Sequence, residues 1–498
     1  MVGTRIAVIG AGPSGIAAAK ECIAHGLGAD LVVFEKSDQV GGNWVFREDP
    51  GHSSICSTTH TISSKYYSEY EDFALPPDTP DYPHHTQLKK YFQDYAEHFD
   101  VIPRIRFHTE VLHATRREDG AWLIRSSGPG GEQIEVFDVL MVANGHHWNP
   151  YTPEYPGRFD GEFIHSHAFK SNVPFTGKRV LVIGGGNSGA DVAVQCSHVA
   201  ERCCISMRSG QWFVSKFFLG WPIDVIYEKV SGMLPHFMRQ SIMEAATRLI
   251  VGRYEHYGLQ NPDHGLLQCH FTINSELIYS LGHGDIVPRV GVSRFDGDRV
   301  HFEDGSSEVF DAVIAATGYK ITFPFFDKSF IDWEEAKKVP LWRRMFHAEV
   351  PNLYFIGLFQ PRGSIWPLAD YQAMLACLEI TGRYHRPTDM RRAIAHELAH
   401  PHFEFVDSVR HSTEVDYADF RRELLTELKR AGVKPHARPE NASIVQIKAW
   451  ASRRTGAPPR RLRKAAKQRQ NAQRRQAEAR SAAPSGSGAP ADAVAAKQ

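Results

Sequence analysis

The chain has 498 residues, more than one hydrophobic core usually spans, so two or three domains are expected. Hydrophobic residues make up 42% and charged residues 23%, which is typical of a globular protein, and no stretch approaches the roughly 18 consecutive apolar residues of a membrane span. Lys and Arg together number 57, as do Asp and Glu, so the net charge indicates neither a strongly acidic nor a strongly basic partner.

A glycine-rich turn between a strand and a helix is the first motif in the chain. The sequence predicts a strand at Arg5–Ile9 and a helix at Ile16–Ile23, joined by G-A-G-P-S-G. Gly10 permits a tight turn, Gly12 lets the backbone approach a pyrophosphate, and Gly15 lets the helix pack on the strand. The N–H groups at the start of the helix would bind the phosphates. The glycines also favour this interpretation over a secretory signal peptide, which would carry leucines there.

A carboxylate marks the ribose of this first site. The next predicted strand, residues 30–34, ends at Glu35, which lies 20 residues beyond Gly15. A carboxylate at this place accepts hydrogen bonds from a ribose diol, as the dinucleotide-binding fingerprint requires. The first site is therefore predicted to bind FAD or NAD.

The same pattern returns in the middle of the chain with the opposite charge. A strand at Arg179–Ile183 leads into the turn Gly184–Gly189, a helix rich in Ala and Val, and a strand at Cys203–Met207 that ends at Arg208. Glu35 would repel a ribose 2′-phosphate, whereas the Arg208 guanidinium would pair with one. The second site is therefore predicted to bind NADP(H). One such fingerprint is a weak signal, but two with opposite charges at the ribose position indicate two nucleotides.

With these motifs in place, the chain resembles the flavin-containing monooxygenases, class B flavoproteins that oxygenate soft nucleophiles. The resemblance runs from about residue 4 to about residue 435. It implies an α/β fold with two Rossmann-like dinucleotide-binding domains, in which the NADP domain is inserted into the FAD domain. The stretches that carry it are GAGPSG (10–15), EKSDQVGGNW (35–44), ANGHH (143–147), FDGEFIHSHAFK (159–170), GGGNSG (184–189), SMRSGQW (206–212), DAVIAATGY (311–319), NLYFIGLFQPRG (352–363) and SVRHSTEVDYADF (408–420).

The resemblance and the composition divide the chain into four parts. ANGHH and ATGY look like the two linkers between the domains, and helices are predicted at Met390–Leu398 and Phe420–Ala431. The last part is basic and nearly devoid of large apolar side chains, so it is predicted to be disordered. The expected parts are the first segment of the FAD domain (1–169), the NADP domain with a helical insertion at about 211–280 (170–330), the second FAD segment with the C-terminal helices (331–445), and the basic tail (446–498).

The resemblance implies an NADPH- and O2-dependent monooxygenase, with activity of the N,N-dimethylaniline monooxygenase kind. FAD would carry the chemistry through a C4a-hydroperoxyflavin, and the oxygen atom would go to a nucleophilic nitrogen or sulfur of a small molecule. Baeyer–Villiger oxidation of ketones is the competing hypothesis on the same scaffold, but those enzymes carry tryptophan where this chain has Phe169. Two further hypotheses are an uncoupled NADPH oxidase or reductase and a non-enzymatic nucleotide-binding protein.

One position departs from the family pattern. The family usually places an asparagine three residues before a lysine beside the flavin and nicotinamide, and here Ile62 stands three residues before Lys65. Isoleucine has no hydrogen-bonding group, so a polar contact would be lost. Thr61, Ser63 or His60 would supply it if the loop shifts by one residue. Without a replacement, the enzyme would release peroxide. The alternative is that this branch of the family uses a different contact and loses nothing.

Residues that position the cofactors, rather than a catalytic dyad, are the expected site. The supporting candidates near the reaction centre are Thr61, Ile62, Ser63 and His165, the last of which the resemblance places at the junction of the two domains. The His165–His167 pair has no third ligand at a characteristic spacing, so no metal is expected. The expected cofactor-binding residues are Gly10, Gly12, Pro13, Ser14, Gly15, Glu35, Lys36, Gly42, Asn43, Trp44, Thr61, Ile62, Val111, Gly184, Gly186, Asn187, Ser188, Gly189, Arg208, Thr317, Gly318 and Gln360.

The expected partners are a small-molecule substrate and O2. The basic tail has no interleaved aromatic residues, so no specific nucleic-acid binding is expected, and a homodimer is left open. Seven scattered cysteines without a C-x-x-C pair favour a reducing compartment, hence a cytoplasmic protein. Aromatic residues between 211 and 260 are expected to pack against the flavin domain, in preference to lining a channel or touching a membrane.

Overall fold

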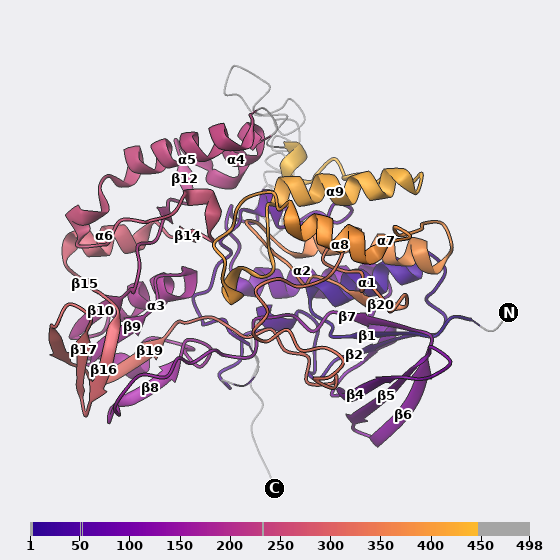
Figure 1. Ribbon diagram of the computed structural model, residues 1–498, viewed down its shortest axis with the longest axis horizontal. Helices are drawn as coiled ribbons and strands as arrows, with labels where there is room; N and C mark the ends of the chain where they lie inside the picture. Colours follow the sequence, from indigo (N-terminus) through magenta and orange to yellow (C-terminus); the bar gives the residue numbers. More distant parts are fainter. Residues whose placement is uncertain (1–2, 50, 52, 232–233, 447–498) are drawn as a thin grey trace, which may run out of the picture. The chain divides into compact units, whose positions relative to one another are not determined.

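The computed structural model describes residues 3–49, 51, 53–231 and 234–446, and the chain up to Pro439 forms one compact unit. Its first parallel sheet has the strand order β20-β7-β1-β2-β3 (Figure 1). Every residue of β1 and β7 is buried, as expected for strands that are covered on both faces. The strands are β1 (Ile6–Ile9), β2 (Leu31–Phe34), β3 (Ile105–Arg106), β7 (Val139–Val142) and β20 (Leu353–Phe355).

Helix α1 packs on this sheet next to the first glycine turn, and two further helices pack on α1. α1 runs from Pro13 to Ala24 and packs against α7, which spans Trp366–Ile380, as Figure 1 shows. α2, from His85 to His98, contacts α1 and begins with a capping box formed by His84 and Gln87. An antiparallel sheet of three strands follows in the chain: β4 (Glu110–Arg116), β5 (Trp122–Gly128) and β6 (Gly131–Phe137).

The second parallel sheet has the order β15-β10-β9-β19-β8, and α3 (Asn187–Ser197) packs on it. Its strands lie between β7 and β20 in the sequence, so the second domain is inserted into the first, which confirms the predicted fold class. β8 pairs with β19, so the second sheet includes residues that precede the domain boundary predicted at residue 170. The strands are β8 (Glu162–His165), β9 (Arg179–Ile183), β10 (Arg202–Ser206), β15 (Val287–Arg289) and β19 (Ala312–Ala315).

The insertion at about 211–280 is not purely helical, because short strands precede and follow its helices. Trp212 and Phe213 are buried in the core beside the second sheet. Phe217 packs edge-to-face on Tyr82 with 5.3 Å between ring centroids, and the Tyr227 hydroxyl donates to Asp416 at 2.7 Å, so part of this aromatic stretch contacts the first domain, as expected. The elements are β11 (Phe213–Val214), β12 (Phe217–Phe218), β13 (Trp221–Pro222), α4 (Ile223–Ser231), α5 (His236–Val251), β14 (Thr272–Ile273) and α6 (Glu276–His283), followed by the antiparallel strands β16 (Val292–Asp296), β17 (Arg299–Phe302) and β18 (Ser307–Val309).

The C-terminal helices agree with the sequence prediction. α8 spans Met390–Ala399 and α9 spans Tyr417–Arg430, each with an aspartate as its N-terminal cap. They follow β21 (Gln360–Pro361), which pairs with β22 (Glu414–Val415). All seven cysteines are free thiols, and no helix within the described residues is long and apolar enough to cross a bilayer. The predicted disordered tail lies outside the described residues except for residue 446.

Candidate functional site

The first glycine turn joins β1 to α1 so closely that no side chain fits at Gly10 or Gly15. Gly10 has φ +101°, and a Cβ there would lie 2.6 Å from the carbonyl oxygen of Ala143 at the end of β7. A Cβ on Gly15 would lie 1.9 Å from the carbonyl oxygen of Gly10. α1 begins at Pro13 with Gly12 as its cap, and no side chain of the described residues caps it. Its first N–H groups therefore have no side-chain acceptor among the described residues and are suited to bind a phosphate.

Glu35 closes one side of this turn. It follows β2, is buried, and its carboxylate accepts hydrogen bonds from the N–H groups of Ala11 (2.7 Å) and Ser37 (2.8 Å). A carboxylate has about four lone-pair positions, so two remain for a ribose diol. The carboxylate of Glu35, which was predicted to accept hydrogen bonds from a ribose, is thus held in place by the backbone of the glycine turn.

The GG-x-W stretch forms the opposite wall. Gly42 has φ +52°, and a Cβ on it would come within 2.9 Å of Gly12 Cα, so the two glycine turns lie in contact. Trp44 packs edge-to-face on Trp366, with 5.8 Å between ring centroids. The Asn43 carboxamide accepts a hydrogen bond from Ser54 N–H at 2.7 Å and so holds the loop that follows. Gly42 is thus brought to the first turn, and Trp44 lies on Trp366 of α7.

The second glycine turn repeats the geometry of the first. Gly184 has φ +117°, and a Cβ there would lie 2.4 Å from the carbonyl oxygen of Ala316, which follows β19. A Cβ on Gly189 would lie 1.9 Å from the carbonyl oxygen of Gly184. Gly186 caps α3 without a side-chain hydrogen bond from the described residues. Two equivalent phosphate-binding turns are therefore present in one chain.

The side chains around the second turn divide into structural and available groups. Asn187 accepts a hydrogen bond from Ile273 N–H at 2.8 Å, so its side chain ties α3 to β14. Ser188 and Arg208 are exposed, and Arg208 follows the end of β10 beside the turn, where a ribose would extend. The guanidinium of Arg208 therefore stands at the position equivalent to Glu35 with the opposite charge.

The loop with the unusual isoleucine contains one unpaired buried hydroxyl. Thr61 is buried, and its Oγ1 has no hydrogen-bond partner among the described residues. The Ser63 hydroxyl instead contacts the hydroxyl of Ser364 at 2.9 Å, and His60 Nδ1 bonds to a backbone carbonyl of its own loop. Buried hydroxyls are normally satisfied, so the Thr61 hydroxyl is suited to contact a bound group beside Ile62.

His165 lies at the junction between the second sheet and the second linker. Its Nε2–H donates to the carbonyl oxygen of Gly318 at 3.1 Å, and its Nδ1 accepts from His167 N–H at 3.0 Å. Burial lowers the pKa of His165 to about 4, so the ring is neutral near pH 7. Both ring nitrogens of His165 thus form hydrogen bonds within the protein, so the His-Ser-His stretch links the end of β8 to the second linker.

The linkers bring the remaining candidates near the two turns. Gln360 of β21 contacts His146 of the first linker, with 3.2 Å between Oε1 and Nε2. The Thr317 hydroxyl donates to the carbonyl oxygen of Tyr151. Val111, by contrast, is a buried side chain of the core below the first sheet, so only its backbone is suited to bind a cofactor.

Two residues of the insertion that were not predicted hold the Ile62 loop. Asp224, in the first turn of α4, accepts hydrogen bonds from both the N–H (2.6 Å) and the hydroxyl (2.8 Å) of Ser64. Burial raises the pKa of Asp224. Lys216 Nζ donates to the carbonyl oxygen of Thr61 at 3.4 Å. These pairs join positions about 160 residues apart, so no local motif indicates them.

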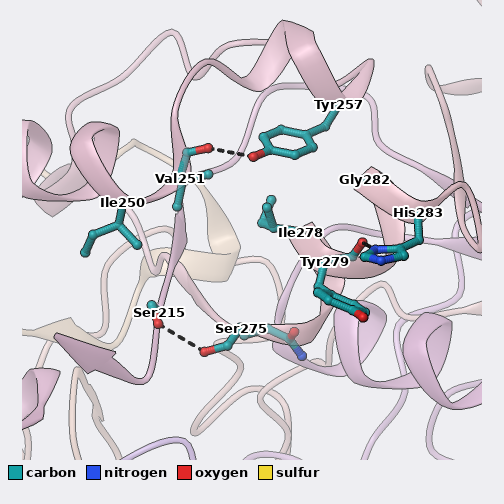
Figure 2. Close-up of a pocket in the computed structure, with 10 residues that line it drawn as sticks. Ser215, Ile250, Val251, Tyr257, Ser275, Ile278, Tyr279, Gly282 and His283 are labelled. Atoms are coloured by element: carbon teal, nitrogen blue, oxygen red, sulfur yellow. Dashed lines mark hydrogen bonds between the residues drawn. The ribbon is translucent and has the colours of Figure 1, made fainter. Parts of the chain in front are cut away.

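A cavity of about 360 Å³ lies within the insertion (Figure 2). One of its wall residues, Asn274, donates to Asp191 of α3 at 2.7 Å, so the cavity borders α3, but it includes none of the predicted site residues. Its lining residues are Ser215, Ile250, Val251, Tyr257, Asn274, Ser275, Ile278, Tyr279, Gly282 and His283.

Comparison with known proteins identifies the family of this double site. Residues 3–438 match the model of the family described as FMO-like, flavin-binding monooxygenase-like. The chain belongs to this family. It is 35% identical to flavin-containing monooxygenase 5 of Oryctolagus cuniculus, over 88% of the chain and 84% of the relative. It is also 35% identical to dimethylaniline monooxygenase [N-oxide-forming] 2 of Rattus norvegicus, over 86% of the chain and 83% of the relative.

Solved structures show the same fold for this flavin monooxygenase family member. S-allyl-L-cysteine S-oxygenase from Allium sativum aligns with a TM-score of 0.64 at 21% identity and covers 91% of the chain and 94% of the neighbour. An oxidized steroid monooxygenase bound to NADP aligns with a TM-score of 0.64 at 17% identity and covers 87% and 99%. Because of the family match and the curated relatives, the chain is an oxidoreductase of the flavin-containing monooxygenase family, and the solved structures agree in fold.

The residues of the first site fit a flavin dinucleotide. The glycine turn excludes any side chain at Gly10 and Gly15, Glu35 has carboxylate lone pairs to spare, and the Thr61 hydroxyl is buried without a partner in the described part of the chain. These features offer a phosphate contact, a ribose contact and one polar contact to a ring system, respectively.

Proposed function

We propose that this chain is an FAD-containing, NADPH- and O2-dependent monooxygenase that oxygenates a nucleophilic nitrogen or sulfur of a small molecule. The observation that carries the proposal is that two matching glycine turns have side chains of opposite charge at the ribose position. Glu35 stands at one of these positions and Arg208 at the other. Family membership and the relative named as an N-oxide-forming monooxygenase support it. The first sheet with the C-terminal helices is assigned to FAD, and the second sheet to NADP(H).

In this proposal the protein binds and orients two cofactors, and bound flavin supplies the redox and oxygen-transfer chemistry. The two glycine turns hold the pyrophosphates, Glu35 accepts from the ribose of FAD, and Arg208 pairs with the 2′-phosphate of NADPH. The Thr61 hydroxyl provides the polar contact that Ile62 cannot make. His165 stays neutral and keeps the second linker in place, without taking a proton itself.

Phe169 supports heteroatom oxygenation over Baeyer–Villiger oxidation. The side chain is buried and stacks on Phe175, with 5.6 Å between ring centroids. It therefore packs as core and offers no indole N–H, unlike the tryptophan of the Baeyer–Villiger enzymes that the sequence resembles less.

A substrate panel tests the proposed function. The purified holoprotein is mixed with NADPH and O2 in the presence of amines, sulfides or ketones, and NADPH consumption, oxygenated product and peroxide are measured together. We expect tertiary amines or sulfides to yield N- or S-oxides, with less peroxide released per NADPH than without substrate. Products from ketones alone would contradict the proposal and favour the Baeyer–Villiger reaction, and peroxide equal to NADPH with every compound would favour an oxidase.

Ile62 is the specific reason to keep an uncoupled NADPH oxidase as a second candidate. We expect Ile62→Asn to lower the ratio of peroxide released to NADPH consumed severalfold, because asparagine restores a hydrogen-bonding group at this position. Ile62→Val is the matched control, since it changes volume without adding polarity. If the ratio is the same in the wild type and Ile62→Asn, the missing amide has no role. A higher ratio in Thr61→Val would then identify Thr61 as the replacement.

A further inference from the structure

A guanidinium from the C-terminal part of the chain lies at the second glycine turn. A Cβ built on Gly186, the cap of α3, would be 3.0 Å from Nη2 of Arg410. Arg410 belongs to the short helical turn Val409–His411, which is more than 200 residues away in the sequence. No local motif of the sequence indicates this contact.

No acidic side chain of the described residues forms an ion pair with Arg410. Arg410 is exposed, and no hydrogen bond or ion pair to its side chain is found within the described residues. The two acids nearest in the sequence bind elsewhere: Asp407 pairs with Lys337 at 2.8 Å, and Glu414 contacts His270 at 3.4 Å. The guanidinium of Arg410 is therefore available to an anionic ligand.

Two positive groups face the same point. The start of α3 carries the positive end of the helix dipole, and its first N–H groups lack a side-chain acceptor in the described part of the chain. A second cation beside that end is unfavourable unless an anion lies between the two. The pyrophosphate of a dinucleotide is the anion that a glycine turn of this type binds.

The segment that bears Arg410 is fixed to the first domain. The Ser408 hydroxyl contacts His411 Nδ1 at 2.7 Å, which closes the turn around Arg410. Directly after it, the carbonyl oxygen of Thr413 accepts from Gln360 N–H at 2.9 Å, and β22 pairs with β21. Arg410 is thus presented to the turn of the second domain from an element of the first, so a nucleotide bound there would contact both domains.

We propose that Arg410 is a positioning residue that binds the pyrophosphate of NADP(H) at the second glycine turn. The inference rests on the proposed function and deepens it. Arg208 selects the 2′-phosphate, whereas Arg410 binds the group that NADP(H) shares with NAD(H). Because Arg410 comes from the first domain, its contact also sets the depth at which the dinucleotide lies between the domains.

Equilibrium binding to the oxidised holoprotein separates the two arginines. The variants are Arg410→Ala, Arg410→Lys and Arg208→Ala, and the ligands are NADP+, NAD+ and 2′-AMP, which carries the 2′-phosphate but no pyrophosphate. We expect Arg410→Ala to raise the Kd for NADP+ and for NAD+ about tenfold or more and to leave 2′-AMP binding unchanged. Arg410→Lys should fall between, since it keeps the charge but loses the planar fork. Arg208→Ala should weaken NADP+ and 2′-AMP and spare NAD+.

Controls make each outcome decisive. Arg125→Ala, on the antiparallel strand β5, removes an exposed guanidinium far from both turns in the sequence and should bind every ligand as the wild type does. The Kd for NADP+ should also depend less steeply on salt in Arg410→Ala, because one phosphate contact fewer is screened. Equal affinity for NADP+ in the wild type and Arg410→Ala would overturn the role of Arg410 alone. A wild type that binds no NADP+ would overturn the proposed function with it.

Discussion

Replacing Gly189 with alanine should give a yellow protein that NADPH no longer reduces. A Cβ at this position would lie 1.9 Å from the carbonyl oxygen of Gly184, so α3 has to move away from β9 and the turn has to open. A misplacement of about 1 Å at a binding group costs on the order of a hundredfold, and the effect on the rate of flavin reduction by NADPH should reach at least that size. Anaerobic mixing, followed at the flavin absorbance band, measures this rate.

The matched replacement in the first turn should impair the binding of flavin, and not its reduction by NADPH. A Cβ on Gly15 would lie 1.9 Å from the carbonyl oxygen of Gly10, so Gly15→Ala should yield a protein that no longer retains flavin. Gly130→Ala is the control, because a Cβ there would lie 3.7 Å from Gln133 Nε2, which is ordinary contact. Dithionite should reduce the flavin of Gly189→Ala normally. If NADPH reduced the flavin of Gly189→Ala at the wild-type rate, the second glycine turn would not be part of the NADPH site.

These two turns were predictable from the sequence because the chemistry that requires them is local. A strand, a turn and a helix lie within about 20 residues, and the close contact that requires Gly15 lies inside that unit, although the contact that requires Gly10 comes from Ala143 of the neighbouring strand. The strands at Arg179–Ile183 and Cys203–Met207 were predicted within one residue of their observed bounds for the same reason. The fold class followed from the repetition of the unit.

The parts of the site that the sequence did not indicate depend on long-range packing. Arg410 approaches Gly186 only because β22 pairs with β21, and Asp224 meets Ser64 only because α4 folds back on the first domain. β8 precedes the predicted boundary at 170 yet pairs in the second sheet, since its partner β19 lies about 150 residues later. Periodicity describes which residues are buried, but not which distant element buries them.

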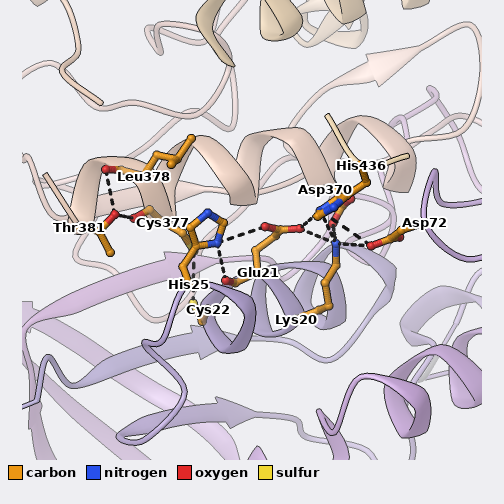
Figure 3. Close-up of polar contacts among 10 residues, drawn as sticks. All are labelled: Lys20, Glu21, Cys22, His25, Asp72, Asp370, Cys377, Leu378, Thr381 and His436. Carbon is orange, nitrogen blue, oxygen red and sulfur yellow. Dashed lines mark hydrogen bonds and ion pairs between the residues drawn. The ribbon is translucent and has the colours of Figure 1, made fainter. Parts of the chain in front are cut away.

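Charged side chains from distant parts of the chain gather around Lys20 of α1 (Figure 3). Lys20 is only 2% exposed, and its ammonium lies 2.9 Å from Asp72 and 2.8 Å from Asp370 and also pairs with Glu21. His436 approaches Glu21 at 2.6 Å. Although burial opposes it, Asp370 and the other acids hold the pKa of Lys20 above its usual value. Glu21, Asp370 and His436 are close enough to share a metal ion, but the Lys20 ammonium already supplies a cation to this group.

Lys20→Met should lower the free energy of unfolding by about 3–5 kcal/mol, because it leaves three carboxylates around a buried space without their cation. Urea unfolding of the holoprotein, followed by flavin fluorescence and by circular dichroism, measures the loss. Lys90→Met is the matched control, since Lys90 pairs with Asp94 on the exposed face of α2 and its side chain is 74% exposed. That variant should unfold at the wild-type urea concentration. A similar loss in both would contradict the special role of the buried ammonium.

The pH dependence of this loss provides the stricter test. Burial raises the pKa of Asp370 to about 7, above that of an unfolded aspartate, so the folded state takes up a proton more readily, and the stability from that proton is lost as the pH rises through 7. The hydrogen bond to Glu21 raises the pKa of His436, whose contribution is likewise present at low pH and lost as the pH rises through its folded pKa. Without Lys20, protonation is the remaining way to relieve the repulsion among the carboxylates. The deficit of Lys20→Met relative to the wild type should therefore be larger at pH 8 than at pH 5.5. A deficit that is constant or shrinks over that range would mean that the carboxylates are not ionised against Lys20 in the native protein.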